Sequence, residues 1–265
     1  MHDHDRGLEF DLATLRSRRS VLALFGGAGL AVIAGCAATD PTPSPATTST
    51  GTAAGTTAAG LEEIPEETAG PFPGDGFNGP DVLTESGIVR GDIRSSFGSA
   101  SGTADGVPLR IELTVVEADT GAALPGAAVY VWHCDRNGDY SLYSDAAADQ
   151  NYLRGVQEAD DTGDLVYTSI FPAAYAGRWP HVHFEVYPTL ADATNAGTKL
   201  TTSQLALPQD VCETVYATDG YDRSVRNLAG TSLERDTVFS DGWDSQLATV
   251  TGDPSGYTAT LTVAV

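Results

Sequence analysis

Residues 107–132 read VPLRIELTVVEADTGAALPGAAVYVW, and this stretch carries the pattern that decides the fold. From Leu109 to Val115 apolar and polar side chains alternate, which is the period of a β-strand with one buried face. Asp119-Thr120-Gly121 is typical of a turn, and the apolar run at 127–132 indicates a second short strand. The stretch therefore predicts short strands joined by tight turns.

The rest of the chain repeats this pattern. We expect further strands at 165–170, 181–187, 204–207, 237–240 and 257–265, and a short helix at 221–228. The 29 glycines and 14 prolines suit a turn-rich all-β protein. The predicted fold class is all-β: a β-sandwich of mostly antiparallel strands with long loops, in one domain over residues 61–265.

The segment before this domain is predicted to direct export and to tether the domain. A twin-arginine pattern at 17–22 opens an apolar run at 21–33, and the small residues before Cys36 resemble a bacterial lipobox. We interpret 1–36 as a twin-arginine lipoprotein-type signal peptide and 37–60 as a flexible Thr/Ala/Pro/Gly linker. The expected location is the extracellular face of the cytoplasmic membrane, with the lipid anchor at Cys36. Secretion after ordinary cleavage is the alternative.

Charge and cysteine content exclude several classes of protein. The chain has 14 basic and 36 acidic side chains and a net charge of -22. A surface of this sign repels phosphate backbones, so nucleic acid is excluded as a partner. Three cysteines, Cys36, Cys134 and Cys212, are too few for a disulfide scaffold or a cysteine-rich zinc site. We expect Cys134 and Cys212 to form a disulfide, which export permits, with two buried thiols as the alternative.

A pair of histidines, His181 and His183, lies in the otherwise apolar strand predicted at 181–187. Residues two apart on a strand point to the same face, so both imidazoles converge on one point. Two imidazoles side by side in a core are costly unless something binds them. The pair therefore indicates a metal site, although zinc, copper and a hydrogen-bonded pair all fit the pattern by itself.

Two tyrosines and an arginine are placed to join this pair. Tyr140 follows the turn at 135–138, and a Pro/Gly-bounded loop brings Tyr175 and Arg178 to the start of the histidine strand. The pKa of a phenol is about 10, so only a strong Lewis acid such as Fe(III) holds two phenolates at neutral pH, whereas zinc rarely recruits tyrosine. The opposing interpretation makes both tyrosines edge aromatics of the sandwich and Arg178 a surface charge.

Two other groups of polar residues have simpler interpretations. The run 132–135 (WHCD) lacks a second cluster, which disfavours a zinc site, and His133 points away from the face of Trp132 and is expected to be structural. The aspartates at 160–164 lack the spacing of a calcium loop, so a turn accounts for them.

Four segments in order resemble the intradiol ring-cleavage dioxygenases. They read ETAGPFPGDG (67–76), VYVWHCDRNGDYS (129–141), LRGVQEADDTGDLVYTSIFPAAYAGRWPHVHFEV (153–186) and SQLALP (203–208). The family includes the protocatechuate 3,4-dioxygenases and catechol 1,2-dioxygenases, and the chain is most similar to the exported, single-domain branch. It departs from the family at Ala173-Ala174, where glycine is common, and at Ala159, where the exported branch often has threonine.

This resemblance implies a ferric site with the ligands Tyr140, Tyr175, His181 and His183. Tyr175 would be the axial ligand that leaves when substrate binds and acts as a base. Arg178 would stabilise negative charge on the substrate, and Gln204 matches a pocket glutamine.

The implied reaction is the cleavage of a catechol-type ring between its two hydroxylated carbons. Dioxygen is the second substrate, and the product is a muconate-type diacid. The alternative from another class is a non-catalytic, transthyretin-like module that binds carbohydrate or protein. Such modules resemble the chain around 121–140 but have no reason to keep the four ligands together. A cupin-like oxygenase would need more histidines and a carboxylate ligand.

Overall fold

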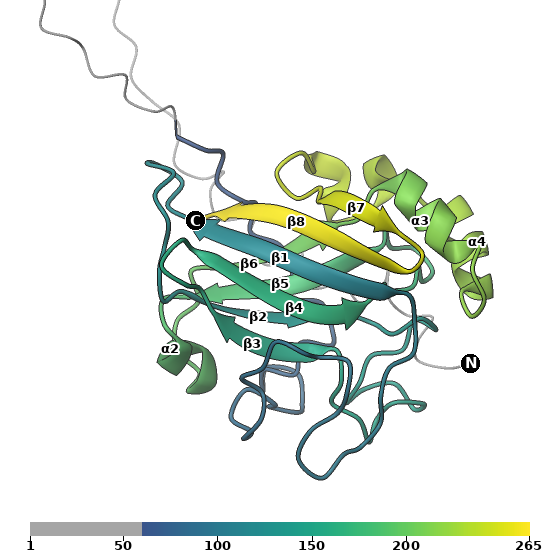
Figure 1. The fold of residues 1–265 in the computed structure, drawn as a ribbon, viewed down its shortest axis with the longest axis horizontal. Coiled ribbons are helices and arrows are strands. Elements are labelled where there is room, and N and C mark those ends of the chain that lie inside the picture. Colours follow the sequence, from purple (N-terminus) through teal and green to yellow (C-terminus); the bar gives the residue numbers. More distant parts are fainter. Residues whose placement is uncertain (1–59) are drawn as a thin grey trace, which may run out of the picture.

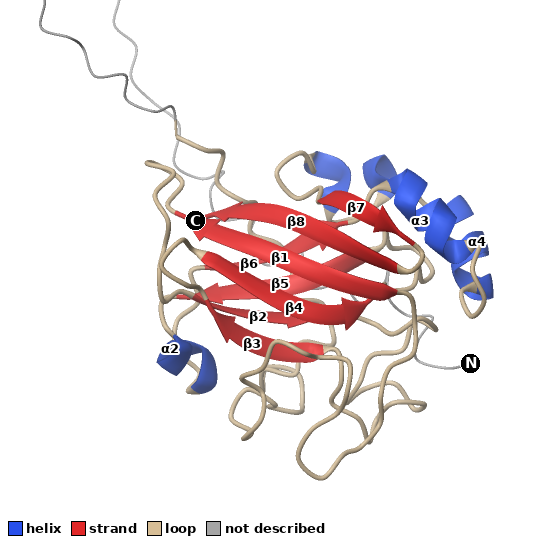
Figure 2. Cartoon of the chain, viewed as in Figure 1, coloured by secondary structure: helices blue, strands red, loops and turns tan. Residues whose placement is uncertain are grey.

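The computed structural model describes residues 60–265, in which two four-stranded sheets pack face to face (Figure 1). Helices are few and lie at the ends of the sandwich, and long loops cover much of the remaining surface (Figure 2). The predicted all-β sandwich is therefore confirmed for the part of the chain that the structure describes.

The first sheet has the order β4-β1-β8-β7. Its strands are β1 Pro108–Val116, β4 Asp164–Ile170, β7 Thr249–Asp253 and β8 Gly256–Ala264. β1 is antiparallel to β4 and parallel to β8, and β7 and β8 are antiparallel. The outer face of this sheet is polar, because threonines and charged residues alternate with the core residues along β1 and β8.

The second sheet has the order β3-β2-β5-β6 and is antiparallel throughout. Its strands are β2 Ala128–Trp132, β3 Arg154–Glu158, β5 His181–Tyr187 and β6 Thr201–Ala206. Every residue of β2, β5 and β6 is buried, so both faces of this sheet are covered.

Two apolar clusters account for this burial. Between the sheets, Ile111, Val129 and Phe184 belong to the sandwich core and are fully buried. On the outer face of the second sheet, Tyr130 and Trp132 pack against a separate cluster contributed by loops before β1 and after β2. A polar group on this outer face is therefore removed from water without lying inside the sandwich.

The helices are short. They are α2 Leu190–Thr194, α3 Gln209–Tyr216 and α4 Asp222–Ala229, with the 3₁₀ turns η3 Leu233–Arg235 and η4 Phe239–Asp241. α3 and α4 lie together at one end of the sandwich, and α2 lies at the other (Figure 1). The helix predicted at 221–228 is confirmed as α4, and within residues 60–265 no helix is long and apolar enough to cross a membrane.

Two details of the expected fold are wrong. The strand predicted at 237–240 is instead a turn that leads into η4, because the Asp236 carboxylate accepts hydrogen bonds from the amides of Val238 and Phe239 and so turns the backbone. The disulfide between Cys134 and Cys212 is absent. Both are buried free thiols, as the alternative held.

Other predictions concern the part of the chain before residue 60. The twin-arginine signal peptide, the lipid anchor at Cys36 and the linker at 37–60 lie outside the described residues and stay predictions.

Candidate metal centre

The two histidines of β5 project from the outer face of the second sheet. Val182 and Phe184, which alternate with His181 and His183, point inward and belong to the sandwich core. Both imidazoles are buried, with exposed fractions of 2% and 3%. β6 pairs with β5 so that Gln204 lies directly opposite His183. The strand alternation predicted from sequence therefore places both imidazoles, and Gln204 beside them, on one face.

Tyr140 approaches these imidazoles from the loop after β2. That loop is shaped by Asp135, whose carboxylate accepts the amides of Asn137 and Asp139 and closes a tight turn before the tyrosine. The Tyr140 amide donates to the Ser144 hydroxyl, which fixes the next turn. Tyr140 is 2% exposed, so its phenol is held deep in the site.

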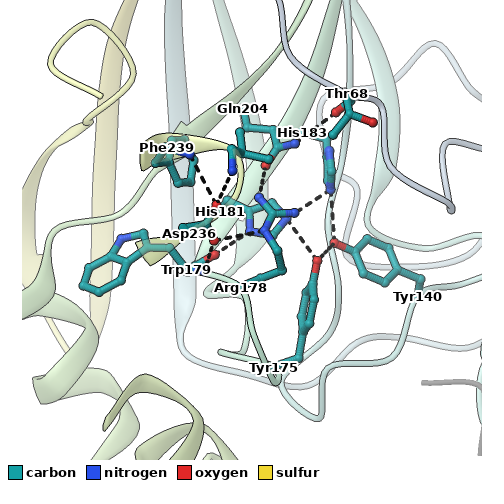
Figure 3. Close-up of polar contacts among 11 residues, drawn as sticks. Thr68, Tyr140, Tyr175, Arg178, Trp179, His181, His183, Gln204, Asp236 and Phe239 are labelled. Carbon is teal, nitrogen blue, oxygen red and sulfur yellow. Dashed lines mark hydrogen bonds and ion pairs between the residues drawn. The ribbon is translucent and has the colours of Figure 1, made fainter. Parts of the chain in front are cut away.

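Tyr175 approaches from the loop between β4 and β5. The backbone of this loop is held by α4 and the residues around it, because Ser224 accepts the Ala174 amide and Asn227 donates to the Ala174 carbonyl. Tyr175 is half-buried, in contrast to Tyr140. The two phenols point toward the two imidazoles from different directions (Figure 3). The Tyr175 side of the cluster is therefore the side nearer to solvent.

Four potential ligand atoms form a closed ring. The distance between the His181 and His183 Nε2 atoms is 3.1 Å, and the distance from Tyr140 Oη to His183 Nε2 is 3.3 Å. Tyr175 Oη lies 3.3 Å from His181 Nε2 and 3.4 Å from Tyr140 Oη. Atoms bound about 2.1 Å from one ion lie about 3.0–3.4 Å apart at ordinary bond angles. The ring therefore has the dimensions of a set of metal ligands.

The protonation of the imidazoles fits metal binding. His181 Nδ1 faces the Trp179 carbonyl oxygen at 2.5 Å, and because a carbonyl only accepts, Nδ1 carries the proton and Nε2 presents its lone pair to the ring. Burial, together with the charge of Arg178, lowers the pKa of His181. Burial and the neighbouring His181 likewise lower the pKa of His183. Both imidazoles are thus neutral, which is the form that binds metal.

The phenols indicate what kind of ion the site suits. Burial raises the pKa of Tyr140 well above its ordinary value, and the nearby Tyr175 adds to this effect. A phenolate at this depth needs a strongly charged cation beside it. Within residues 60–265 no cluster of three or more His, Cys, Asp or Glu side chains is placed to hold a metal, and the two phenols are the further donors that stand beside the two imidazoles. Two neutral imidazoles and two phenols fit a hard trivalent ion better than zinc.

Arg178 is buried beside this ring rather than exposed as a surface charge. Its exposed fraction is 1%. Arg178 Nε donates to Asp236 Oδ2 at 3.0 Å, and Nη2 donates to Gln204 Oε1 at 2.6 Å. Gln204 Nε2 in turn donates to the Thr68 carbonyl at 3.0 Å, in the segment that precedes the first sheet. The six residues singled out from the sequence thus lie in one connected cluster (Figure 3).

His133 lies apart from this cluster, as expected. Its Nδ1 donates to the Cys134 carbonyl, and its Nε2 accepts from the Ser169 hydroxyl, both at 2.7 Å. Its two ring nitrogens are therefore satisfied by protein groups, which is the structural role predicted.

Sequence reasoning missed two neighbours of the site. The sequence did not indicate Asp236, because the residues after it resembled a strand. Its partner Arg178 is also 58 positions away in the chain. Trp132 was noted only as the neighbour of His133, yet its indole stacks on His183 with ring centroids 4.8 Å apart. The alternation of β2 could have identified Trp132 as facing the site, whereas no local pattern identifies Asp236.

Comparison with known proteins identifies a family for this chain. A family model described as Dioxygenase matches residues 78–212, about half of the chain, and this span contains all four candidate ligands as well as Arg178 and Gln204. A chlorocatechol 1,2-dioxygenase from Rhodococcus opacus is 37% identical over 67 residues, which cover 25% of this chain and 26% of that protein. The match thus spans about a quarter of that relative.

Solved structures agree in fold. An intradiol ring-cleavage dioxygenase from Tetranychus urticae superposes with a TM-score of 0.61 at 22% identity, covering 77% of this chain and 94% of that one. The dioxygenase domain of a carbohydrate-binding fusion protein from Streptomyces sp. SirexAA-E gives a TM-score of 0.50 at 18% identity, covering 77% and 98%. The family model, which covers about half of the chain, shows that the chain belongs to the intradiol ring-cleavage dioxygenase family, and the solved structures agree with it in fold.

Proposed function

We propose that this protein is a non-haem Fe(III) dioxygenase that cleaves a catechol-type ring between its two hydroxylated carbons and gives a muconate-type diacid. The observation that carries the proposal is the closed ring of two phenol oxygens and two imidazole nitrogens, 3.1 to 3.4 Å apart. Both atoms of dioxygen enter the product, so the overall reaction needs no external reductant.

Bound through these four side chains, Fe(III) would orient the two substrate oxygens and withdraw electron density from the ring. The protein supplies the rest. Tyr140 and His183 are buried and fixed, so they stay in place through the cycle. Tyr175 is closer to solvent, so its phenolate oxygen can move aside and accept a proton from a substrate hydroxyl.

Arg178 and Gln204 would act on the substrate rather than on the ion. The Arg178 guanidinium is permanently charged and removed from water, so its attraction for negative charge is little screened. A charge that grows on the ring during oxygen attack would be stabilised there. Gln204 is bound to both Arg178 and the Thr68 carbonyl, which keeps the guanidinium facing the ring of donors.

Metal content, colour and oxygen uptake test the proposal together. The purified protein should contain about one iron per chain, absorb visible light through tyrosinate-to-iron charge transfer, and consume oxygen on a panel of catechols. Tyr140→Phe and His183→Ala should lose iron and colour. Tyr167→Phe is the matched control, because its buried hydroxyl donates to the Val129 carbonyl inside the sandwich. Stoichiometric zinc, or a colourless and inactive protein, would instead support a binding module of the transthyretin-like kind.

A further inference from the structure

Arg178 is a buried cation whose ion-pair partner comes from the far end of the chain. Asp236, which directly follows η3, is 0% exposed, and its Oδ2 accepts from Arg178 Nε at 3.0 Å. Removing a charge from water is unfavourable, so a buried guanidinium needs a well-placed carboxylate. The family model ends at residue 212, so Asp236 lies outside the matched segment.

The Asp236 carboxylate is itself held rigidly. Oδ2 accepts a second hydrogen bond from the Trp179 amide at 2.6 Å, and Oδ1 accepts from the amides of Val238 and Phe239 at 2.8 and 3.3 Å. Burial by itself raises the pKa of Asp236. The charge of Arg178 and the hydrogen bonds from Trp179 and Arg178 outweigh burial and hold that pKa below its usual value. The carboxylate is therefore ionised and has little freedom to turn.

The Asp236 carboxylate contacts two groups next to the ring of donors, the Arg178 guanidinium and the Trp179 amide. The Arg178 guanidinium donates from Nε to Asp236 and from Nη2 to Gln204. These two hydrogen bonds together fix the plane of the guanidinium. Asp236 also accepts a hydrogen bond from the Trp179 amide, and the Trp179 carbonyl, in the next peptide group, accepts from His181 Nδ1. Figure 3 shows Asp236 on the opposite side of Arg178 from the two tyrosines.

We propose that Asp236 is the positioning residue of the site: it holds the Arg178 guanidinium in the orientation that stabilises negative charge on the substrate. This inference rests on the proposed function. Asp236 does not touch the ring of donors. Of its two contacts toward the site, Arg178 and the Trp179 amide, we assign its effect on turnover to Arg178. Without the charge of Asp236, the guanidinium loses the carboxylate that holds its Nε and turns away from the position that the reaction needs.

A double-mutant cycle in the iron-loaded full-length protein tests the proposal. Asp236→Asn keeps the size of the side chain and one accepting oxygen, removes the charge, and replaces the other accepting oxygen with a donating NH2 group. It should lower kcat by about tenfold or more, with a smaller change in KM because the interaction strengthens in the transition state. Arg178→Gln should lower kcat further. In the double variant, kcat should equal that of Arg178→Gln within about twofold. Losses that multiply would overturn the proposal, because Asp236 would then act independently of Arg178.

Thermal stability supplies a readout that does not depend on turnover. Asp236→Asn leaves a buried cation without its carboxylate, so it should melt at a lower temperature than the double variant, which has neither charge. Tyr167→Phe, a buried hydrogen-bond deletion in the sandwich, should lower the melting temperature and leave kcat and KM unchanged. A double variant that fails to fold while Arg178→Gln folds would count against the proposal, as would melting effects that simply add. A wild-type protein inactive on every catechol would refute the proposed function, while the melting cycle would still report whether the two residues are coupled.

Discussion

The indole of Trp132 lies flat on the imidazole of His183, with ring centroids 4.8 Å apart and an interplanar angle of 5°. His183 Nδ1 is buried and has no hydrogen-bond partner within residues 60–265, in contrast to His181, whose Nδ1 is held by the Trp179 carbonyl. The two candidate ligands are thus oriented by different means, His181 by a hydrogen bond and His183 by stacking.

Under the proposed function, Trp132 should be a determinant of metal affinity, because its indole stacks on His183. Trp132→Leu removes the stacking surface, so His183 gains freedom to rotate, and iron affinity should fall by about tenfold to a hundredfold. Competition with a chelator, followed by the visible absorbance, measures the change. Trp132→Phe keeps an aromatic face and should stay within about threefold of wild type. Equal affinities for the leucine variant and wild type would show that stacking does not hold His183.

The two tyrosines should respond differently to loss of their hydroxyls. Tyr175→Phe removes the half-buried phenol, so the protein should retain part of its iron while turnover falls by about a hundredfold or more, the scale for losing a general base. Tyr140→Phe removes the fully buried phenol and should lose most of the iron itself. Iron content and kcat, measured on the same preparations, separate the two effects. Identical iron loss in both variants would contradict the assignment of Tyr175 as the ligand that leaves.

The two buried thiols should be unreactive in the folded protein and reactive after unfolding. Burial raises the pKa of both Cys134 and Cys212, so neither forms a thiolate readily in the folded state. Alkylation followed by peptide mapping should label neither residue in the native protein and both after denaturation. A disulfide would appear as protection of both residues after denaturation, reversed by dithiothreitol.

His133 should make the domain sensitive to mild acid. Burial lowers the pKa of His133 from 6.5 to about 4, although the hydrogen bond to the Cys134 carbonyl opposes the shift. Between these values the unfolded chain binds a proton that the folded chain does not, so the free energy of unfolding falls as the pH drops from 6.5 toward 4. The total effect is about 3 kcal/mol.

The matched variant is His133→Gln, which cannot titrate in this range. Urea unfolding at several pH values should show a steeper loss of stability for wild type than for the variant below pH 6.5. Parallel curves would show that His133 is protonated to the same extent in both states.

The predicted export signal leads to a test that concerns location alone. If Cys36 carries the lipid anchor, Cys36→Ser should move the protein from the membrane fraction to the soluble extracellular fraction, with kcat and iron content unchanged. Fractionation and immunoblotting measure the shift. A protein that stays in the membrane fraction would rule out lipidation at Cys36 as its anchor.

Periodic patterns allowed the strands that carry the site to be predicted. β5 was predicted with its observed limits, because alternation along His181–Tyr187 separates core residues from site residues. β3, Arg154–Glu158, has a polar sequence and was missed. Arg154 is buried there because its guanidinium binds the carbonyls of Phe72, Pro73 and Ser141, which lie far from it in the sequence.

Pairings between distant residues could not be predicted from sequence alone. The expected disulfide failed because export permits a bond between Cys134 and Cys212 but says nothing of the distance between them. Asp236 was missed for the same reason, since its importance depends on a partner on another loop. The strand pattern indicated His181 and His183, and the resemblance to the intradiol dioxygenases implied the full set of four candidate ligands.

The alternation of β5 also couples the chemistry of the site to the hydrophobic effect. A shift of β5 by one residue would turn both imidazoles into the apolar core of the sandwich. It would also turn Val182 and Phe184 to the outer face of the sheet, where the site lies. The burial of these apolar side chains therefore keeps the imidazoles aligned. A substitution that shortens Phe184, without changing any polar group, should therefore loosen the positions of His181 and His183.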